Sequence, residues 1–382
     1  RRERGKRSRS RRRRPASPCA GAADMAARRL AAQHGCPGAG AGAYVVALAC
    51  DDGASAPDCL VASVSEDAGG GGLLEVLDLP QLRPACAVRG PHAGAAAEDL
   101  CFLRGSPRCL ASCGADGSAL LWDLREGGGG QVRPARTLLA GGGDPAAAVA
   151  LCPDGRLCAC ASGAAVRVLE LGSGRELFAH EEAHSEPVSR LRFHPRRAGE
   201  LLSAGDDGLL CALDCRRCEQ GGKAVEEDAG LRLVMNTEEG VDRLGLVADD
   251  LAVACTVSTT GLLQLWSLGG PQPGALLARH DCLRGEPALR VGESDGYVLG
   301  TLYDEGSGVA HVAAGGVDGR LGLFHLNLEA ASFSGLVPHG AGGGGHSGVV
   351  RSLAQLGASR RFATGGEDGL VCLWRPAGRR PA

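Results

Sequence analysis

Short hydrophobic runs with alternating polarity, separated by turns rich in glycine, recur along the chain. Three segments share this plan most clearly: LASCGADGSALLWDL at residues 110–124, LLSAGDDGLLCALDC at 201–215 and FATGGEDGLVCLWRP at 362–376. In each, an apolar stretch leads to an Asp-Gly pair and then to a second alternating run. Asp-Gly between two runs of period two is a strong signal of a β-hairpin. These windows therefore predict antiparallel strands rather than helices.

Weaker copies of the plan lie at residues 60–79, 157–171, 253–268 and 312–326. The residue near the end of the second run can be followed through seven copies at steps of 44 to 58 residues: Leu77, Trp122, Leu169, Leu213, Trp266, Phe324 and Trp374. A closed ring of small sheets buries each sheet against its neighbours and leaves only short edges. We therefore predict an all-β fold, a seven-bladed β-propeller over residues 43–376. The strand AYVVALAC at 43–50 precedes the first copy, and we expect it to close the ring against the last blade.

The repeated units resemble the WD-repeat family. Trp122-Asp123 matches the dipeptide of the family signature, and Trp374-Arg375 is a variant of it. Histidines of the kind that open a repeat lie 28 to 30 residues before the Trp position in three units. The resemblance covers about residues 44–376 and implies the propeller fold. Segments at residues 193–208, 298–316 and 364–378 further resemble one particular member of the family.

The resemblance also implies a set of structural residues. In the family, a His, a strand Ser or Thr, the turn Asp and the Trp form a buried hydrogen-bonded tetrad. The matching positions here are His92, Ser112, Asp116 and Trp122; His346, Thr364, Asp368 and Trp374; and His184, Ser203 and Asp207, with Leu213 at the Trp position. Because leucine has no polar hydrogen, we expect the last of these networks to be incomplete.

Charge is distributed unevenly along the chain. Residues 1–24 carry ten basic and two acidic side chains, whereas the rest of the chain carries a net charge of −11. We expect a disordered basic segment over residues 1–42 and a short disordered tail over 377–382. Met25 is a candidate translation start, in which case residues 1–24 are absent from the native protein; if present, they could bind RNA or act as a nuclear address. Because residues 25–382 are this acidic, their surface is poorly suited to bind nucleic acid.

Seventeen cysteines are scattered along the chain, many of them inside apolar runs, and no secretory signal precedes them. Buried free thiols in a reducing compartment explain this pattern, so we expect an intracellular protein of the cytoplasm or nucleus that is not secreted. No run approaches 18 uncharged apolar residues, and no membrane contact is expected. Cys215-Arg216-Arg217-Cys218 supplies one C-x-x-C, which is half of a zinc site. We predict no metal and no cofactor.

Two motifs invite an enzymatic interpretation. Residues 180–184, HEEAH, match the H-E-x-x-H of zinc proteases, which requires a helix to bring both histidines to one metal. Pro187 and the alternating VSRLRF predict a turn and a strand instead. Residues 292–296, GESDG, match G-x-S-x-G, but the strand-like YVLGTLY follows where a nucleophile elbow needs a helix. We therefore predict a protein that is not an enzyme and has no catalytic residues.

Binding is the function that the fold suggests, because a propeller presents loops on a rigid frame. We expect a scaffold for other proteins, with a propeller that is monomeric by itself. As an alternative, Trp122-Asp123-Leu124-Arg125 resembles the W-D-x-R box of substrate receptors that dock on the adaptor of cullin-RING ubiquitin ligases. There Arg125 would meet acidic adaptor residues, although residues 169–172, LELG, do not provide a second box. A second alternative is a nuclear RNP or ribosome-biogenesis scaffold, which depends on the basic N-terminus.

Overall fold

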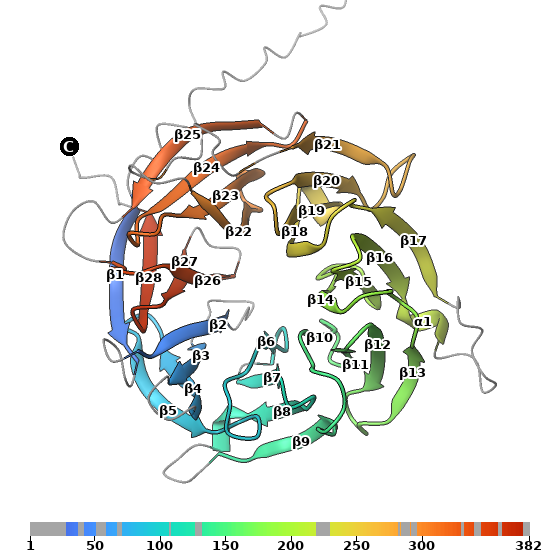
Figure 1. Ribbon diagram of the computed structural model, residues 1–382, viewed down its shortest axis with the longest axis horizontal. Coiled ribbons are helices and arrows are strands. Elements are labelled where there is room, and N and C mark those ends of the chain that lie inside the picture. Colours follow the sequence, from blue (N-terminus) through green and yellow to red (C-terminus); the bar gives the residue numbers. More distant parts are fainter. Residues whose placement is uncertain are drawn as a thin grey trace, which may run out of the picture.

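The computed structural model describes most of the chain between residues 28 and 376. The described ranges are 28–36, 42–50, 59–66, 71–106, 108–126, 132–218, 230–281, 283, 291, 296–329, 332–339, 345–357 and 361–376. Their regular structure is almost entirely β-strand, arranged as seven antiparallel sheets of four strands around a common axis (Figure 1). The prediction of an all-β, seven-bladed propeller is thus confirmed. Residues 1–27 and 377–382, on which the predicted tails fall, lie outside the described ranges.

Six blades are built from four consecutive strands each, running from the axis outward. The first blade consists of β2 (Tyr44–Cys50), β3 (Cys59–Glu66), β4 (Gly71–Asp78) and β5 (Arg83–Arg89), and the second of β6 (Asp99–Phe102), β7 (Cys109–Cys113), β8 (Ala119–Asp123) and β9 (Pro134–Leu139). The third consists of β10 (Val149–Leu151), β11 (Leu157–Ser162), β12 (Ala165–Glu170) and β13 (Glu176–His180), and the fourth of β14 (Val188–Phe193), β15 (Glu200–Gly205), β16 (Leu209–Asp214) and β17 (Leu231–Asn236). The fifth consists of β18 (Val241–Val247), β19 (Val253–Ser258), β20 (Leu263–Ser267) and β21 (Leu276–His280), and the sixth of β22 (Tyr297–Asp304), β23 (Val309–Gly315), β24 (Leu321–Asn327) and β25 (Ser332–His339).

The seventh blade closes the ring with a strand from the other end of the chain. It consists of β26 (Val350–Gln355), β27 (Phe362–Gly366), β28 (Leu370–Pro376) and, on the outside, β1 (Arg28–Gly35). β1 pairs antiparallel with β28, and the two lie side by side in Figure 1. The expectation that residues 43–50 close the ring was therefore wrong, because that segment forms β2, the innermost strand of the first blade. The closing strand lies inside the segment 1–42 that we expected to be disordered.

The Asp and Gly residues of the turns stabilise the hairpins, as the sequence predicted. Between β15 and β16, Gly208 has a φ of 73°, a left-handed conformation that glycine adopts without strain. Asp207 stabilises the same turn, since its Oδ1 accepts a hydrogen bond from the backbone N–H of Leu209 at 3.0 Å. All seven residues of the Trp position lie on the third strand of a blade, as the repeat spacing predicted.

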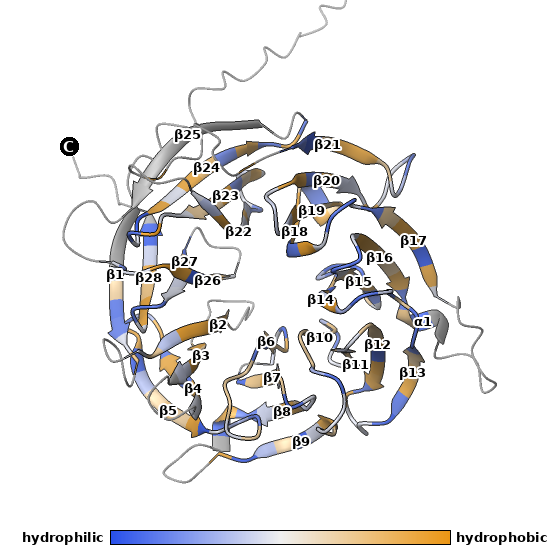
Figure 2. Cartoon of the chain, in the orientation of Figure 1, coloured by the Kyte–Doolittle hydropathy of each residue, from blue (hydrophilic) through white to orange (hydrophobic). Residues whose placement is uncertain are grey.

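The hydrophobic core lies mainly between the blades. The cluster that joins the third and fourth blades, for example, packs Ala159 and Val168 against Val188, Phe193 and Leu213. Hydrophobic residues concentrate on the strands, whereas hydrophilic residues concentrate in the connecting turns (Figure 2). Each sheet is thereby covered by its neighbours, which is what a ring of small sheets requires.

Helical structure is minor in the described ranges. It consists of α1 (Cys215–Cys218) and the 3₁₀ turns η2 (Leu124–Glu126) and η3 (Asp249–Leu251). The C-x-x-C pair noted in the sequence thus lies on α1, with Cys215 buried between the third and fourth blades. No helix among the described residues has the length and apolar character needed to cross a membrane.

Candidate functional site

A complete chain of hydrogen bonds links four residues of the seventh blade. The indole N–H of Trp374 donates to Thr364 Oγ1 at 2.8 Å, and Thr364 Oγ1 lies 2.8 Å from His346 Nε2. On the other side of the imidazole, His346 Nδ1 lies 3.0 Å from Asp368 Oδ1. One assignment satisfies every group: Trp374 donates to Thr364, Thr364 to His346, and His346 to Asp368. The structure thus brings together the four residues that the resemblance selected in this blade.

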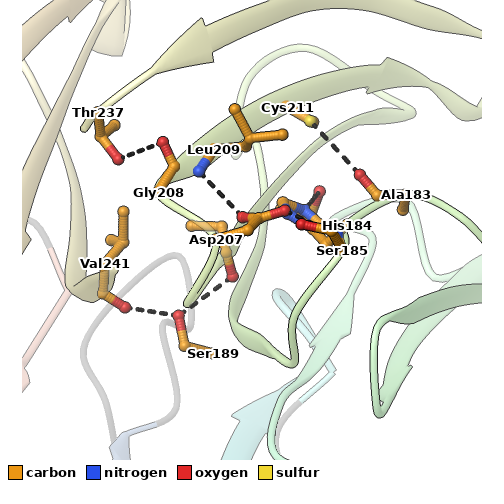
Figure 3. A network of polar contacts seen from close by, with 12 residues as sticks. Ala183, His184, Ser185, Ser189, Asp207, Gly208, Leu209, Cys211, Thr237 and Val241 are labelled. Atoms are coloured by element: carbon orange, nitrogen blue, oxygen red, sulfur yellow. Dashed lines mark hydrogen bonds and ion pairs between the residues drawn. The ribbon is translucent and has the colours of Figure 1, made fainter. Parts of the chain in front are cut away.

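The fourth blade has the same chain without its last donor. His184 Nδ1 lies 3.0 Å from Asp207 Oδ1, and the two residues face each other in Figure 3. His184 Nε2 lies 2.9 Å from Ser203 Oγ. Leu213 occupies the Trp position and packs in the core instead. The neighbouring Ser189 donates to the backbone carbonyl of Val241, which ties this blade to the fifth.

In the second blade a serine separates the histidine from the aspartate. His92 Nδ1 lies 2.8 Å from Ser118 Oγ, and the Ser118 hydroxyl donates to Asp116 Oδ1 at 2.7 Å. The direct separation of His92 Nδ1 and Asp116 Oδ1 is 3.4 Å. His92 Nε2 and the Trp122 indole both lie 2.8 Å from Ser112 Oγ. Sequence reasoning missed Ser118, although it directly follows the Asp-Gly pair.

These networks lower the pKa of their aspartates. Burial opposes ionisation of Asp368, but hydrogen bonds from His346 and from the backbone N–H groups of Ser347 and Leu370 outweigh it and lower the pKa. The same balance lowers the pKa of Asp207. Each network joins the segment before the first strand of a blade to the second strand and to the turn that follows it. The hydrogen bonds thus cross-link parts of one blade.

The H-E-x-x-H segment does not form a helix. His180 ends β13, residues 181–183 form a turn, and His184 belongs to the network of the fourth blade. Glu181 pairs with Arg167 at 2.9 Å, so the glutamate that a zinc protease would use faces a cation instead. Of the G-x-S-x-G segment, residues 292–295 lie outside the described residues, and strand β22 follows.

The W-D-x-R segment lies at a blade end. Trp122 is buried, and Arg125 lies in η2 directly after β8 with 68% of its side chain exposed. Asp123 holds the guanidinium in a two-point contact, in which Nε and Nη2 of Arg125 donate to the carboxylate at 2.8 and 2.6 Å. The sequence pattern therefore yields an exposed arginine whose direction is fixed by its own aspartate.

A hollow of the described residues is the central channel. Its volume is about 700 Å³, and residues from the innermost strand of all seven blades line it. The charged residues of its lining are six arginines and three acids: Arg104, Arg190, Arg192, Arg243, Arg351 and Arg361, with Glu98, Asp99 and Glu305. This excess of positive charge contrasts with the net −11 of residues 25–382.

Three of the arginines form a cluster near one end of the channel. Arg190 and Arg243 are the third residues of β14 and β18, and Arg351 is the second residue of β26. A β-bulge at this point of each strand shifts the register, which changes the direction of the side chains that follow. Burial lowers the pKa of Arg243. The charge of Asp242 opposes this shift, and the nearby charges of Arg190 and Arg351 add to it.

Three carboxylates lie near this cluster. Asp242 lies 3.5 Å from both Arg190 and Arg243, Glu367 pairs with Arg351, and the charge of Arg190 acts on Asp99 of the lining. The buried Nε of Arg243 has no hydrogen-bond partner. An arginine cannot lose its charge in a protein, so an N–H left unpaired in a buried position is unfavourable until an acceptor reaches it.

Sequence reasoning missed this cluster, although a signal was present. Each of the three strands begins near a Val-x-Arg triplet, at residues 188–190, 241–243 and 349–351. These triplets lie at the starts of the innermost strands, away from the Asp-Gly turns by which the repeats are recognised.

Known proteins resemble this chain both in one repeat and along most of its length. The family model described as WD domain, G-beta repeat matches residues 343–375. WD repeat-containing protein GTS1 of Arabidopsis thaliana is 26% identical over 291 residues, which cover 71% of this chain and 67% of that protein. The WD repeat-containing protein 89 homolog of Dictyostelium discoideum is 23% identical over 267 residues, which cover 69% of this chain and 67% of that protein. WD repeat-containing protein 89 is the family member that residues 193–208, 298–316 and 364–378 resemble, and the similarity to its homolog confirms that resemblance.

Proposed function

We propose, from the premise that this chain is a WD-repeat β-propeller of seven blades, that its central channel binds an acidic segment of a partner protein. Propellers of this family are in general not enzymes, and the fold is that of a protein-interaction scaffold. The observation that carries the finer proposal is the cluster of Arg190, Arg243 and Arg351 at the channel. Its guanidinium groups offer charge-assisted hydrogen bonds to carboxylates.

The walls of the channel suit a peptide. Its lining combines arginines with apolar side chains such as Leu48, Leu299 and Leu353. A segment that carries both acidic and aliphatic side chains would pair with the first and bury against the second. The rigid ring keeps the strands that carry the arginines in place before the partner arrives, which reduces the entropy that binding loses.

A protein segment is favoured over single-stranded nucleic acid. Nucleic-acid channels combine positive charge with exposed aromatic rings on which bases stack. The aromatic residues of this lining, Phe102, Phe193 and Tyr303, are at most 8% exposed. The acidic body would also repel phosphates outside the channel.

Fluorescence anisotropy with a labelled oligoglutamate peptide tests the proposal, with oligoglutamine and an RNA oligonucleotide as comparison probes. The triple variant Arg190→Gln, Arg243→Gln, Arg351→Gln should weaken peptide binding by at least about tenfold, because each charge-assisted contact contributes about 1.5–3 kcal/mol. The matched control is Arg156→Gln, Arg175→Gln, Arg320→Gln, which removes the same charge from exposed positions outside the lining. Both proteins keep the basic residues of the N-terminus, so those residues do not explain a difference.

Equal affinities of the two triple variants would refute the channel as the binding site. Tight binding of the RNA, lost in the channel variant, would favour the RNP scaffold over the peptide scaffold. Added salt should weaken the peptide complex less in a recessed site than on an open surface.

Docking on a cullin-RING adaptor is a second candidate, supported by the exposure of Arg125. Strands alternate in direction within a blade, so Arg125, after the third strand, lies on the face opposite the starts of β14 and β18. An adaptor at Arg125 would leave the arginine end of the channel open for a substrate. Co-precipitation of the adaptor should be lost with Arg125→Ala and kept with Arg156→Ala; unchanged recovery with Arg125→Ala would eliminate this candidate.

A further inference from the structure

The seam at which the ring closes contains a group of three side chains suited to a metal. His34 lies on β1, Cys36 directly follows it, and Glu75 lies on β4 of the first blade. One potential ligand atom from each lies within 4.8 Å of the other two. His34 Nε2 and Glu75 Oε1 are 3.1 Å apart. Among the described residues, this is the group of histidine, cysteine and acidic side chains that meets this geometry.

Glu75 is in an unfavourable position for a carboxylate without a cation. It alternates with Leu73 and Leu77 on the face of β4 that packs against the last blade, and it is 4% exposed. Its Oε2 is buried and accepts no hydrogen bond. Burial of an incompletely paired carboxylate is unfavourable, and a bound cation removes that penalty.

Cys36 is held firmly beside this carboxylate. It is 2% exposed, and its backbone N–H donates to the carbonyl of Gly369 at 2.9 Å. Burial, followed by the negative charge of Glu75 and a hydrogen bond to its carboxylate, raises the pKa of the thiol. A divalent cation would take the place of the thiol proton beside this carboxylate.

We propose that His34, Cys36 and Glu75 bind a divalent cation of the zinc type that links β1 to the first blade across the closing seam. The donors are one nitrogen, one sulfur and one oxygen, a set that zinc accepts and that magnesium and calcium do not favour. Ligands of tetrahedral zinc lie about 3.5 Å from one another, so the three side chains need to move by about 1 Å. The fourth position of the tetrahedron is open to water.

The link would act at the seam between the last blade and the first. There β1 pairs with β28, Cys36 packs in the hydrophobic cluster that both blades share, and His34 contacts Glu75. The proposed site adds a bond between β1 and a different sheet, since Glu75 belongs to the first blade. A cation that binds the folded ring and not the open one stabilises the closed ring by mass action.

Cobalt(II) titration of the full chain, freed of metal beforehand, is the experiment of choice. A cysteine ligand gives a near-ultraviolet sulfur-to-cobalt charge-transfer band, and tetrahedral geometry gives intense visible bands. We expect the protein to bind one equivalent of cobalt and to show both signals. Zinc should displace the cobalt and remove them. Cys36→Ser should abolish the charge-transfer band, and Glu75→Gln should lower the affinity by more than the roughly 10–100-fold that loss of an outer-sphere partner costs.

Matched variants separate this site from the other cysteines. Cys86→Ser, on β5 of the same blade, and Glu176→Gln, on an outer strand elsewhere, should leave band and affinity unchanged. Zinc should also raise the melting temperature of the wild-type protein but not that of Glu75→Gln. Absence of a charge-transfer band in the wild type, or its persistence in Cys36→Ser, would overturn the proposal. If the variants do not fold, X-ray absorption of the zinc-loaded wild type decides, because the proposal requires one sulfur among the zinc neighbours.

Discussion

Gly366 and His346 approach each other so closely that a methyl group on Gly366 would lie 2.7 Å from Nδ1 of the imidazole. It would also lie 2.7 Å from Asp368 Oδ1, the atom that the imidazole faces. The glycine before the turn is thus a condition for the hydrogen-bond chain of the seventh blade. Gly205 in the fourth blade has the same relationship to His184 and Asp207.

Gly366→Ala should therefore destabilise the protein by about 1–3 kcal/mol, because the added carbon displaces both the histidine and the aspartate. The free energy of unfolding in urea measures the effect. Gly172→Ala is the matched control, since a Cβ there meets nothing within 4 Å. Its effect should stay within about 0.5 kcal/mol. A similar small effect for Gly366→Ala would contradict the geometry of the network.

Thr364→Val removes the hydroxyl that serves both Trp374 and His346. Two buried groups lose their partner, and each unsatisfied group costs about 1–3 kcal/mol. Thr256→Val provides a comparison in the fifth blade, where the threonine accepts the longer 3.3 Å bond of Trp266. Chemical denaturation should show the larger loss for Thr364→Val, and the reverse order would argue against a satisfied chain in the seventh blade.

Acid should destabilise the protein through Asp207 and Asp368. The pKa of each is lower in the folded protein than in the unfolded chain, so each contributes stability above the unfolded value of about 3.9 that is lost as the pH falls through the folded value. Asp368→Asn should reduce stability near neutral pH. It should also flatten the decline of stability in acid, as measured by denaturation at a series of pH values. If the stability of the variant declines in acid in parallel with that of the wild type, Asp368 is not a source of the acid sensitivity.

Removal of β1 should open the ring. A chain that begins at Gly42 leaves the edge of β28 unpaired and exposes part of the closing seam, so it should lose at least about 2 kcal/mol. A chain that begins at Met25 keeps Arg28–Gly35 and serves as the control. Thermal unfolding monitored by circular dichroism compares the two. Equal stability would show that the pairing of β1 with β28 contributes nothing.

The blades were readable from the sequence because their signals are local. An Asp-Gly turn such as Asp207-Gly208 is specified by the residues of the turn itself. β1 was not readable, since RRLAAQHG has no β-branched or aromatic residue and becomes a strand only through its pairing with β28. The cluster of His34, Cys36 and Glu75 was hidden for the same reason, because ring closure brings together positions that no sequence spacing relates.

The channel arginines were only partly predictable from the sequence. Their Val-x-Arg triplets are visible in the sequence, but nothing local predicts that Arg190, Arg243 and Arg351 meet. Their proximity depends on the closed ring and on the bulges that begin β14, β18 and β26.

Photo-cross-linking of an oligoglutamate peptide that carries a benzophenone, followed by mass spectrometry, locates the bound peptide on the full chain. We expect cross-links to fall on the inner strands β14, β18 and β26 and to disappear in the variant Arg190→Gln, Arg243→Gln, Arg351→Gln. Cross-links on the outer strands or on the N-terminal arginines, unchanged in that variant, would contradict the channel as the site of recognition.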